Sequence, residues 1–253
     1  MMLRVSAALL LLSAAPAVQA HDLALYPIED GERVRLDMYY GDPGKYKLID
    51  KMKFVTLTSQ DQNGQKIQFV RDVEPVANDP RKLVTGPLRL GDFSGGTYVL
   101  SAVYDNGFYV NDLENHTVAT TLDWKSDVLD SGHYIKFAKA LFFVDRPTAG
   151  YDRVVGHRIE FVPQADPYAL KDGDRLPVKL LVDGKPMPDY KVEVGDDTAA
   201  SKIPGIRTDA QGIFRVPLDH KGFYRLAADY RAKSAYPKLF EWDNYTTSLV
   251  FRR

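Results

Sequence analysis

The residues of this chain most open to a chemical interpretation are its five histidines, because one of them follows an expected cleavage point. His21 follows the small-residue tripeptide "VQA", and cleavage after Ala20 would make it the first residue of the mature chain. Its α-amine and ring Nδ1 would then close a six-membered chelate around one metal ion, with the Asp22 carboxylate beside them. An unperturbed amine titrates near ~7.7–8.0 and an imidazole near ~6.5, so a metal can displace both protons near neutral pH.

A second nitrogen ligand would come from a histidine elsewhere in the chain. His116 lies in an irregular stretch, His133 begins an apolar run, and His157 opens the second half, so each is a candidate partner of His21. His220 lies in the turn "LDHKGF", where side chains are usually exposed, and ranks last. A nitrogen-rich site of this kind suits Ni²⁺, Cu²⁺ or Zn²⁺. The alternative is that a peptidase simply happens to cut before His21, and the position alone supports both interpretations equally.

Enzymatic chemistry has little support in the sequence. The chain contains no Gly-x-Ser-x-Gly, no P-loop and no His-Glu-x-x-His, and no pair of carboxylates stands out as the acid and base of a glycan hydrolase. The aromatic segment "FEWDNYTTS" (240–248) could line a ligand site through Trp242 and Tyr245. These observations favour a binding protein over an enzyme.

The first 20 residues have the pattern of a cleaved signal peptide. Arg4 precedes the apolar run "VSAALLLLSAA" (5–15), which Pro16 ends. The 253-residue chain has no cysteine, which excludes a lipoprotein anchor and disulfides, and no later run reaches the roughly 18 apolar residues of a membrane helix. A net charge of −1 without basic blocks gives no sign of nucleic-acid binding. We expect an exported, periplasmic protein that is not embedded in a membrane.

The rest of the chain predicts an all-β fold. Short apolar runs separated by Gly, Pro, Asn and Asp are typical of antiparallel strands, and Asn63-Gly64 marks a hairpin turn. The expected strands are 33–40, 53–60, 66–72, 97–104, 135–144, 158–164, 175–184, 190–196, 212–218, 223–230 and 246–253. Residues 106–133 lack a clear period, so we expect a long loop excursion there, with one short helix near 122–130.

An internal sequence repeat, which we call the echo, predicts two domains. "GTYVLSAVY" (96–104) and "GFYRLAADY" (222–230) share the pattern Gly-x-Tyr-x-Leu-x-Ala-x-Tyr, whose alternate residues lie on one face of a strand. The echo favours two tandem antiparallel sandwiches of the immunoglobulin-like or transthyretin-like type, at 21–148 and 154–253. Any inward-facing strand after a glycine turn can show this pattern, which is the simpler alternative.

The second half resembles the DUF4198 family. "RIEFVPQADPYALKDGDRLPVKLLVDGKPMPDYKVEV" (158–194) is similar to the recurrent core of that family, "RTDAQGIFRVPL" (207–218) to its Thr-Asp-x-x-Gly-x-Phe segment, and "IKFAKALFFV" (135–144) to its Tyr-Ala-Lys-Ala-Leu strand. "AHDLALYP" resembles the usual mature start, with Ala24 in place of a tryptophan. Family members often carry a histidine after the "LxA" strand, where this chain has Asp229 and Tyr230.

The resemblance implies an association with cobalt or nickel uptake. We therefore expect a non-enzymatic periplasmic protein that binds or delivers Ni or Co to membrane uptake machinery, with His21, Asp22, His116, His133 and His157 as candidate ligands. In vitro, Cu²⁺ would outcompete both metals. The alternative is a carbohydrate- or protein-binding β-sandwich without metal.

Overall fold

The computed structural model describes residues 21–253 apart from 32, 69–71, 87, 90–94, 115, 126, 200, 201 and 204. The expected signal peptide, residues 1–20, lies outside the described residues. The described chain is all-β, as predicted, with short 3-10 turns such as η1 (Lys51–Lys53) and η4 (Leu122–Trp124). None of the helices in this described part is long and apolar enough to cross a membrane.

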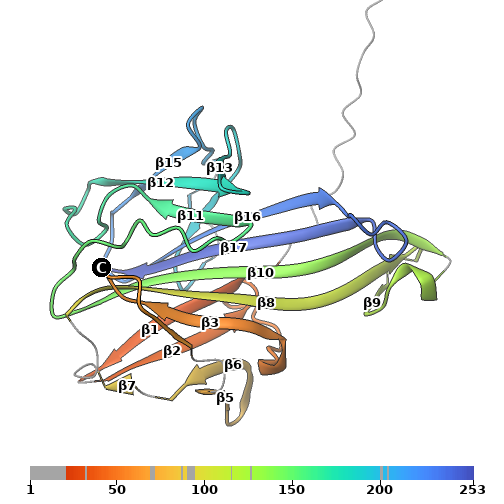
Figure 1. Ribbon diagram of the computed structural model, residues 1–253, viewed down its shortest axis with the longest axis horizontal. Helices are drawn as coiled ribbons and strands as arrows, with labels where there is room; N and C mark the ends of the chain where they lie inside the picture. Colours follow the sequence, from red (N-terminus) through yellow and green to blue (C-terminus); the bar gives the residue numbers. More distant parts are fainter. Residues whose placement is uncertain are drawn as a thin grey trace, which may run out of the picture.

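The strands form three sheets stacked as layers (Figure 1). The β1 sheet, drawn lowest in Figure 1, contains β1 (Leu23–Asp30), β2 (Arg33–Tyr40), β5 (Val73–Val76), β6 (Asp79–Thr85) and β7 (Leu88–Arg89). The central sheet contains β3 (Phe54–Gln60), β4 (Lys66–Gln68), β8 (Gly96–Asp112), β9 (Thr117–Val118), β10 (Val128–Val144), β14 (Glu193–Gly195), β16 (Phe223–Lys233) and β17 (Trp242–Arg252). The β12 sheet contains β11 (Ile159–Pro163), β12 (Arg175–Val182), β13 (Lys185–Pro186) and β15 (Ile213–Pro217).

Two hydrophobic cores lie on opposite faces of the central sheet. Between the β1 sheet and the central sheet, residues such as Leu25 and Met38 pack on Leu100 and Ala140. The core on the other face joins the β12 sheet to the odd-numbered residues of β10 and the even-numbered residues of β16. The sandwich packing that the sequence predicts is therefore present twice.

The two halves of the chain are not separate sandwiches, however, because they share the central sheet. β10 of the first half pairs in parallel with β17 of the second half, from Gly132 opposite Trp242 to Ala140 opposite Val250. The run 135–144 is apolar on both faces, and such a strand is stable where both faces are covered. The middle layer satisfies that requirement. In a two-sheet sandwich, one face of this strand would be exposed to solvent.

The internal echo corresponds to equivalent strands in this shared sheet. Tyr98 of β8 stacks on its cross-strand neighbour Phe142 of β10, with ring centroids 5.1 Å apart. Tyr224 of β16 stacks in the same way on Phe251 of β17, also at 5.1 Å. Tyr98 belongs to the core under the β1 sheet and Tyr224 to the core under the β12 sheet. The repeated units therefore face opposite sides of one sheet.

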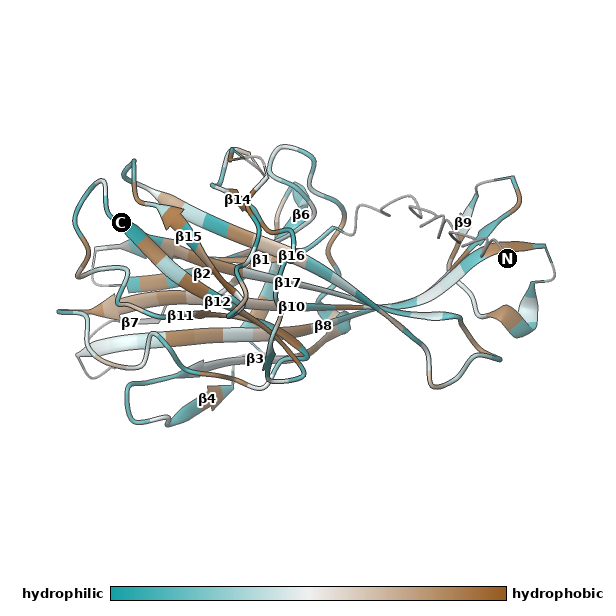
Figure 2. Ribbon diagram, turned by 90° about the horizontal axis from the view of Figure 1, so that it is seen from above, coloured by the Kyte–Doolittle hydropathy of each residue, from teal (hydrophilic) through white to brown (hydrophobic). Residues whose placement is uncertain are grey.

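Residues 106–133 are more regular than expected. β8 continues to Asp112 and β10 begins at Val128, so the connection between them is limited to residues 113–127, which include β9; the expected helix is the single turn η4. The extended ends of these strands project beyond the two outer sheets (Figure 2). Strands without a covering sheet need no apolar face, which is why the alternation that predicts strands is missing there.

Candidate functional site

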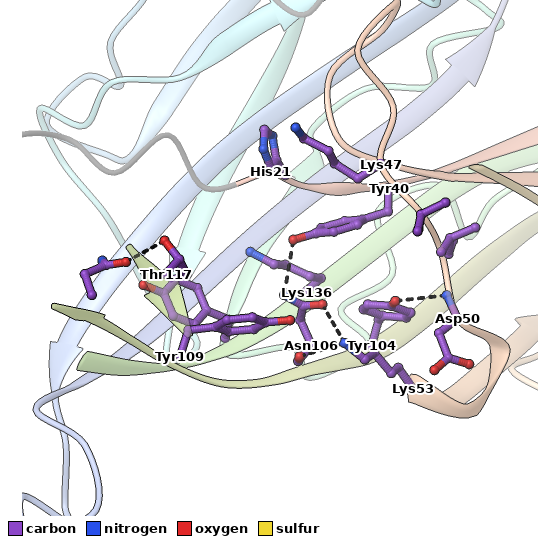
Figure 3. A pocket seen from close by; sticks show the side chains of 14 residues that line it. His21, Tyr40, Lys47, Asp50, Lys53, Tyr104, Asn106, Tyr109, Thr117 and Lys136 are labelled. Carbon is purple, nitrogen blue, oxygen red and sulfur yellow. Dashed lines mark hydrogen bonds between the residues drawn. The ribbon is translucent and has the colours of Figure 1, made fainter. Parts of the chain in front are cut away.

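A cavity of about 580 Å³ opens where the β1 sheet stops covering the central sheet (Figure 3). Its lining comes from the first half of the chain: the start of β1, the end of β2 with the loop that follows, η1, and the extended parts of β8, β9 and β10. Four tyrosines, three lysines and two asparagines line it, whereas Asp50 is the one acid among the described lining residues. The cavity is therefore aromatic, polar and positively charged.

A β-bulge at Asn106 shapes the floor of this cavity. Gly107 pairs with Tyr134 and Asp105 with Ile135, so Asn106 is an extra residue without a partner in the ladder. Gly107 has a φ of 93°, which suits glycine. The bulge lets both Tyr104 before it and Tyr109 after it reach the cavity, although simple alternation would put them on opposite faces.

The Asn106 side chain ties together the walls of the cavity. Its Nδ2 donates to the Tyr40 hydroxyl at 3.2 Å, and its Oδ1 accepts from Lys53 Nζ at 3.1 Å. Burial raises the pKa of Tyr40 and raises that of Tyr104 to about 12. Both phenols are therefore neutral at physiological pH and can donate as well as accept hydrogen bonds.

Lys136 of β10 is the most unusual lining residue, because its ammonium group is buried without a hydrogen bond. The side chain is 1% exposed, and its Nζ makes no hydrogen bond to any described residue. Nζ lies 5.5 Å from the centroid of the Tyr134 ring. Burial lowers the pKa of Lys136 to about 8, while the Asp22 and Asp229 carboxylates act in the opposite direction. A buried charge is costly unless it is paired, so this site is prepared for an external acceptor.

Lys139, three residues further along β10, shows what a structural buried lysine looks like. It lies on the opposite face, and its Nζ donates to Glu160 Oε1 at 2.8 Å, to the Arg153 carbonyl at 2.7 Å and to the Phe161 carbonyl at 3.0 Å. All three ammonium protons are thus used within the protein. Lys136 has no comparable set of partners among the described residues, although both side chains are equally buried.

His21 lies at the mouth of the same cavity. Its ring meets Tyr40 edge to face, with centroids 6.0 Å apart, and its buried Nδ1 has no hydrogen-bond partner among the described residues. Burial lowers the pKa of His21, and the Asp42 carboxylate partly opposes this effect. The imidazole is therefore neutral at pH 7, with a nitrogen able to bind a proton donor or a metal.

Asp22, the second candidate from the start of the chain, points away from the cavity. Its carboxylate is buried and forms an ion pair with Arg225 of β16, while Oδ2 has no partner among the described residues. The adjacent Leu23 carbonyl accepts a hydrogen bond from the Ser248 hydroxyl of β17. The start of the described chain, at residues 22 and 23, is thus attached to strands of the second half, which fixes His21 over the cavity.

The structure does not bring the other candidate histidines to His21. His133 faces the opposite side of β10, where its Nε2 lies 2.8 Å from Asp105 Oδ1 and its ring stacks on Phe108. His157 stacks on Phe137 on that same opposite face, and burial lowers its pKa to about 4. The described residues include no group of three or more His, Asp or Glu side chains arranged to hold a metal.

The two remaining histidines lie in turns, His116 exposed and His220 half-buried. The side chain of His116 is 68% exposed and lies 3.5 Å from Asp112 Oδ2, in the turn between β8 and β9. His220 stacks on Tyr224, and its Nδ1 lies 2.9 Å from Asp219. Neither residue lines the 580 Å³ cavity.

Trp242 and Tyr245 are also outside this cavity. Tyr245 is 6% exposed within the core under the β12 sheet, and its hydroxyl accepts from Arg158. The Trp242 ring packs against two cations, Arg231 at 4.2 Å and Lys233 at 3.6 Å. These contacts occupy the two aromatic residues within the protein itself.

Comparison with protein families matches residues 18–232 to a family described as "Domain of unknown function (DUF4198)". The chain belongs to this family. A search of curated proteins gives no match. In this DUF4198 protein the Lys139–Glu160 ion pair joins two of the segments that carried the resemblance, 135–144 and 158–194, so these two residues have a structural role.

Of the site residues predicted from the sequence, only His21 lines this cavity. Tyr40, Tyr104 and Lys136 also line it, and none of them is among the predicted site residues. One signal was available: "YIKFAKALFF" places two lysines in a strand that is apolar on both faces. Each such lysine needs a partner, and only the structure shows that Lys139 has one.

Proposed function

We propose that this DUF4198 protein is a non-enzymatic binding protein whose cavity at His21 takes a small acidic, hydroxylated molecule, with an acidic sugar as the model ligand. The observation that carries the proposal is Lys136: its side chain is 1% exposed, and its ammonium makes no hydrogen bond to the described residues at the wall of a 580 Å³ cavity. A ligand carboxylate would supply the missing counter-charge and acceptor.

The rest of the lining supports a hydroxylated ligand. Asn106, Asn111 and Thr117 carry groups that together both donate and accept hydrogen bonds, as sugar hydroxyls do. The tyrosine rings provide apolar faces for the C–H surfaces of a sugar ring. Ligand cavities in proteins combine these features: aromatic walls with a few polar groups that fix the orientation.

The proposal is tested by calorimetric titration of D-galacturonate and D-glucuronate at pH 7. We expect at least one of them to bind, and Lys136→Met to weaken that binding at least tenfold. Lys171→Met, at an exposed lysine outside the cavity, is the matched control and should bind like the unchanged protein. Absence of binding by both acids, or equal affinity in Lys136→Met, contradicts the proposal.

A transition metal is a second candidate cargo, and the unpartnered, buried Nδ1 of His21 favours it. If export to the periplasm removes residues 1–20, the new α-amine lies next to this ring and both can chelate Ni²⁺ or Co²⁺ for delivery to a membrane uptake system. The lysines of the cavity repel a bare cation. Any further ligands would therefore come from outside the protein, as with a metal bound to an organic acid.

The metal proposal depends on the exposed α-amine, which one extra residue before His21 would displace. We expect the extended protein and His21→Ala to lose most of the Ni²⁺ affinity of the authentic mature protein, while His220→Ala keeps it. Intact mass of the exported protein first establishes that cleavage follows Ala20. Equal Ni²⁺ affinity in the authentic and extended proteins would exclude the chelate.

A further inference from the structure

A second hollow of about 340 Å³ adjoins the cavity at His21. Lys53, Asn106 and Tyr109 line both spaces, so the two lie side by side at this part of β8. Lys53 Nζ donates to the Asn106 carbonyl at 3.0 Å as well as to its side chain, which keeps the polar divider of Lys53 and Asn106 in place. The two hollows therefore adjoin at the extended part of β8, and the second also reaches Phe108, whose ring stacks on His133 on the other face of the sheet. We call the two hollows together the groove.

The far end of the groove is built around Trp124. This residue is 81% exposed, lies on the turn η4 and lines the second hollow together with Phe108, Thr120 and Thr121. The turn is held in place because the Leu122 N–H donates to the Leu239 carbonyl at 2.8 Å. An exposed indole on a supported turn, with hydroxyl groups beside it, offers a flat apolar surface to a ligand.

The chemistry changes along the groove. The first hollow holds Lys136 and most of the charged groups, whereas the described lining of the second hollow adds no acid and no cation beyond Lys53. A ligand that fills both would therefore be acidic at the Lys136 end and would present a sugar face to Trp124 at the other. A single sugar ring at Lys136 would leave the Trp124 end of the groove unused.

Building on the function proposed above, we propose that the ligand is a short acidic oligosaccharide that spans both hollows. One acidic unit lies at Lys136, and a following unit stacks on Trp124. The polar divider of Lys53 and Asn106 then lies under the linkage between units, where its amide and ammonium groups can reach ring and linkage oxygens.

The test compares galacturonate, digalacturonate and trigalacturonate by calorimetric titration of the full mature protein. We expect affinity to rise at least tenfold from the monomer to the longer ligands. Trp124→Ala should abolish this gain while leaving the monomer affinity unchanged, and Lys136→Met should weaken all three ligands. Tyr236→Ala, which removes another exposed aromatic outside both hollows, is the matched control and should keep the gain.

The outcomes separate this inference from the function on which it rests. If the monomer binds through Lys136 but longer ligands gain nothing, or gain equally in Trp124→Ala, the spanning ligand is wrong and the acidic-sugar cavity stands. If none of the three binds, both proposals fail. A gain for the peptide triglutamate without one for trigalacturonate would show that the groove takes an acidic peptide, and this inference would be wrong.

Discussion

Lys136 and Lys139 lie on the same strand and are equally buried, but their ammonium groups have different surroundings. Lys139 is fully paired with Glu160 and two carbonyls, so removing its partner would damage the fold. The burial of Lys136 is offset by the charges of the Asp22 and Asp229 carboxylates and by the Tyr134 ring, none of which accepts a hydrogen bond from it. At the scale of the residue, Lys136 therefore lowers the stability of the ligand-free protein, as residues kept for binding often do.

Lys136→Met should raise the free energy of unfolding at pH 7 by roughly 1–3 kcal/mol, because it removes a buried charge and keeps the volume. Between about pH 8, the pKa of Lys136 in the folded protein, and about 10.5, the unfolded chain binds more protons than the folded one. The unchanged protein therefore gains stability as pH rises through this window, and the advantage of Lys136→Met disappears there.

Urea unfolding at pH 7 and pH 10 measures both effects. Lys171→Met, at the exposed control position, should change little at either pH. A loss of stability in Lys136→Met at pH 7 would mean that the ammonium has a structural partner after all.

The histidines show why the site could be predicted only in part from the sequence. The position of His21 after Ala20 singled it out without knowledge of the fold, and it does line the cavity. Whether His133 could bind a metal together with His21 depends on which side of β10 the His133 side chain faces. That side depends on the layers above and below the strand, which short-range patterns do not specify.

At the scale of the element, the echo between β8 and β16 corresponds to a repeated structural unit. Each strand carries a tyrosine stacked on a phenylalanine of its neighbour, at 5.1 Å in both cases. The alternation of Tyr224, Leu226 and Ala228 identified their common buried face correctly. This alternation could not predict that β10 pairs with β17. The identity of the neighbouring strand in a sheet does not affect the pattern of apolar and polar residues along a strand.

Strand β1 illustrates a different limit. Residues 23–30 are not among the expected strands, and they contain Pro27, which lacks an N–H donor. β1 is the first strand in the order β1-β2-β6-β5 and pairs within its sheet with β2 alone, so Pro27 can be accommodated there.

Leu226→Ala should cost roughly 2–5 kcal/mol of unfolding free energy, because Leu226 is 0% exposed in the core under the β12 sheet. Leu239→Ala, at a residue that is 40% exposed, is the matched control and should cost much less. Chemical denaturation of both variants checks this. Similar shifts in the two midpoints would contradict the core assignment.

At the scale of the whole molecule, the two halves are joined by far more than the connecting segment. β10 and β17 are parallel neighbours, and the Asp22–Arg225 ion pair links the residue before β1 to β16. The repeat in the sequence predicts independent domains. In the structure, however, strands from both halves form the central sheet, so each half packs on a layer to which the other half contributes.

Thermal unfolding should therefore proceed in one cooperative transition, with equal calorimetric and van't Hoff enthalpies. Destabilising the second half through Leu226→Ala should lower the melting temperature of the entire protein. Two separate transitions, of which only one moves in Leu226→Ala, would show that the halves fold independently.

The central claim is that the Lys136 ammonium binds the carboxylate of an acidic ligand, and the pH dependence of galacturonate affinity tests it most directly. Lys136 is charged below a pKa of about 8, and the neighbouring Asp22 and Asp229 carboxylates are the acids that act on it. Affinity should therefore be constant from pH 6.5 to 7.5 and fall steeply between pH 8 and 9.5, while Lys136→Met binds weakly at every pH. An affinity that stays unchanged through pH 9.5 would contradict the account.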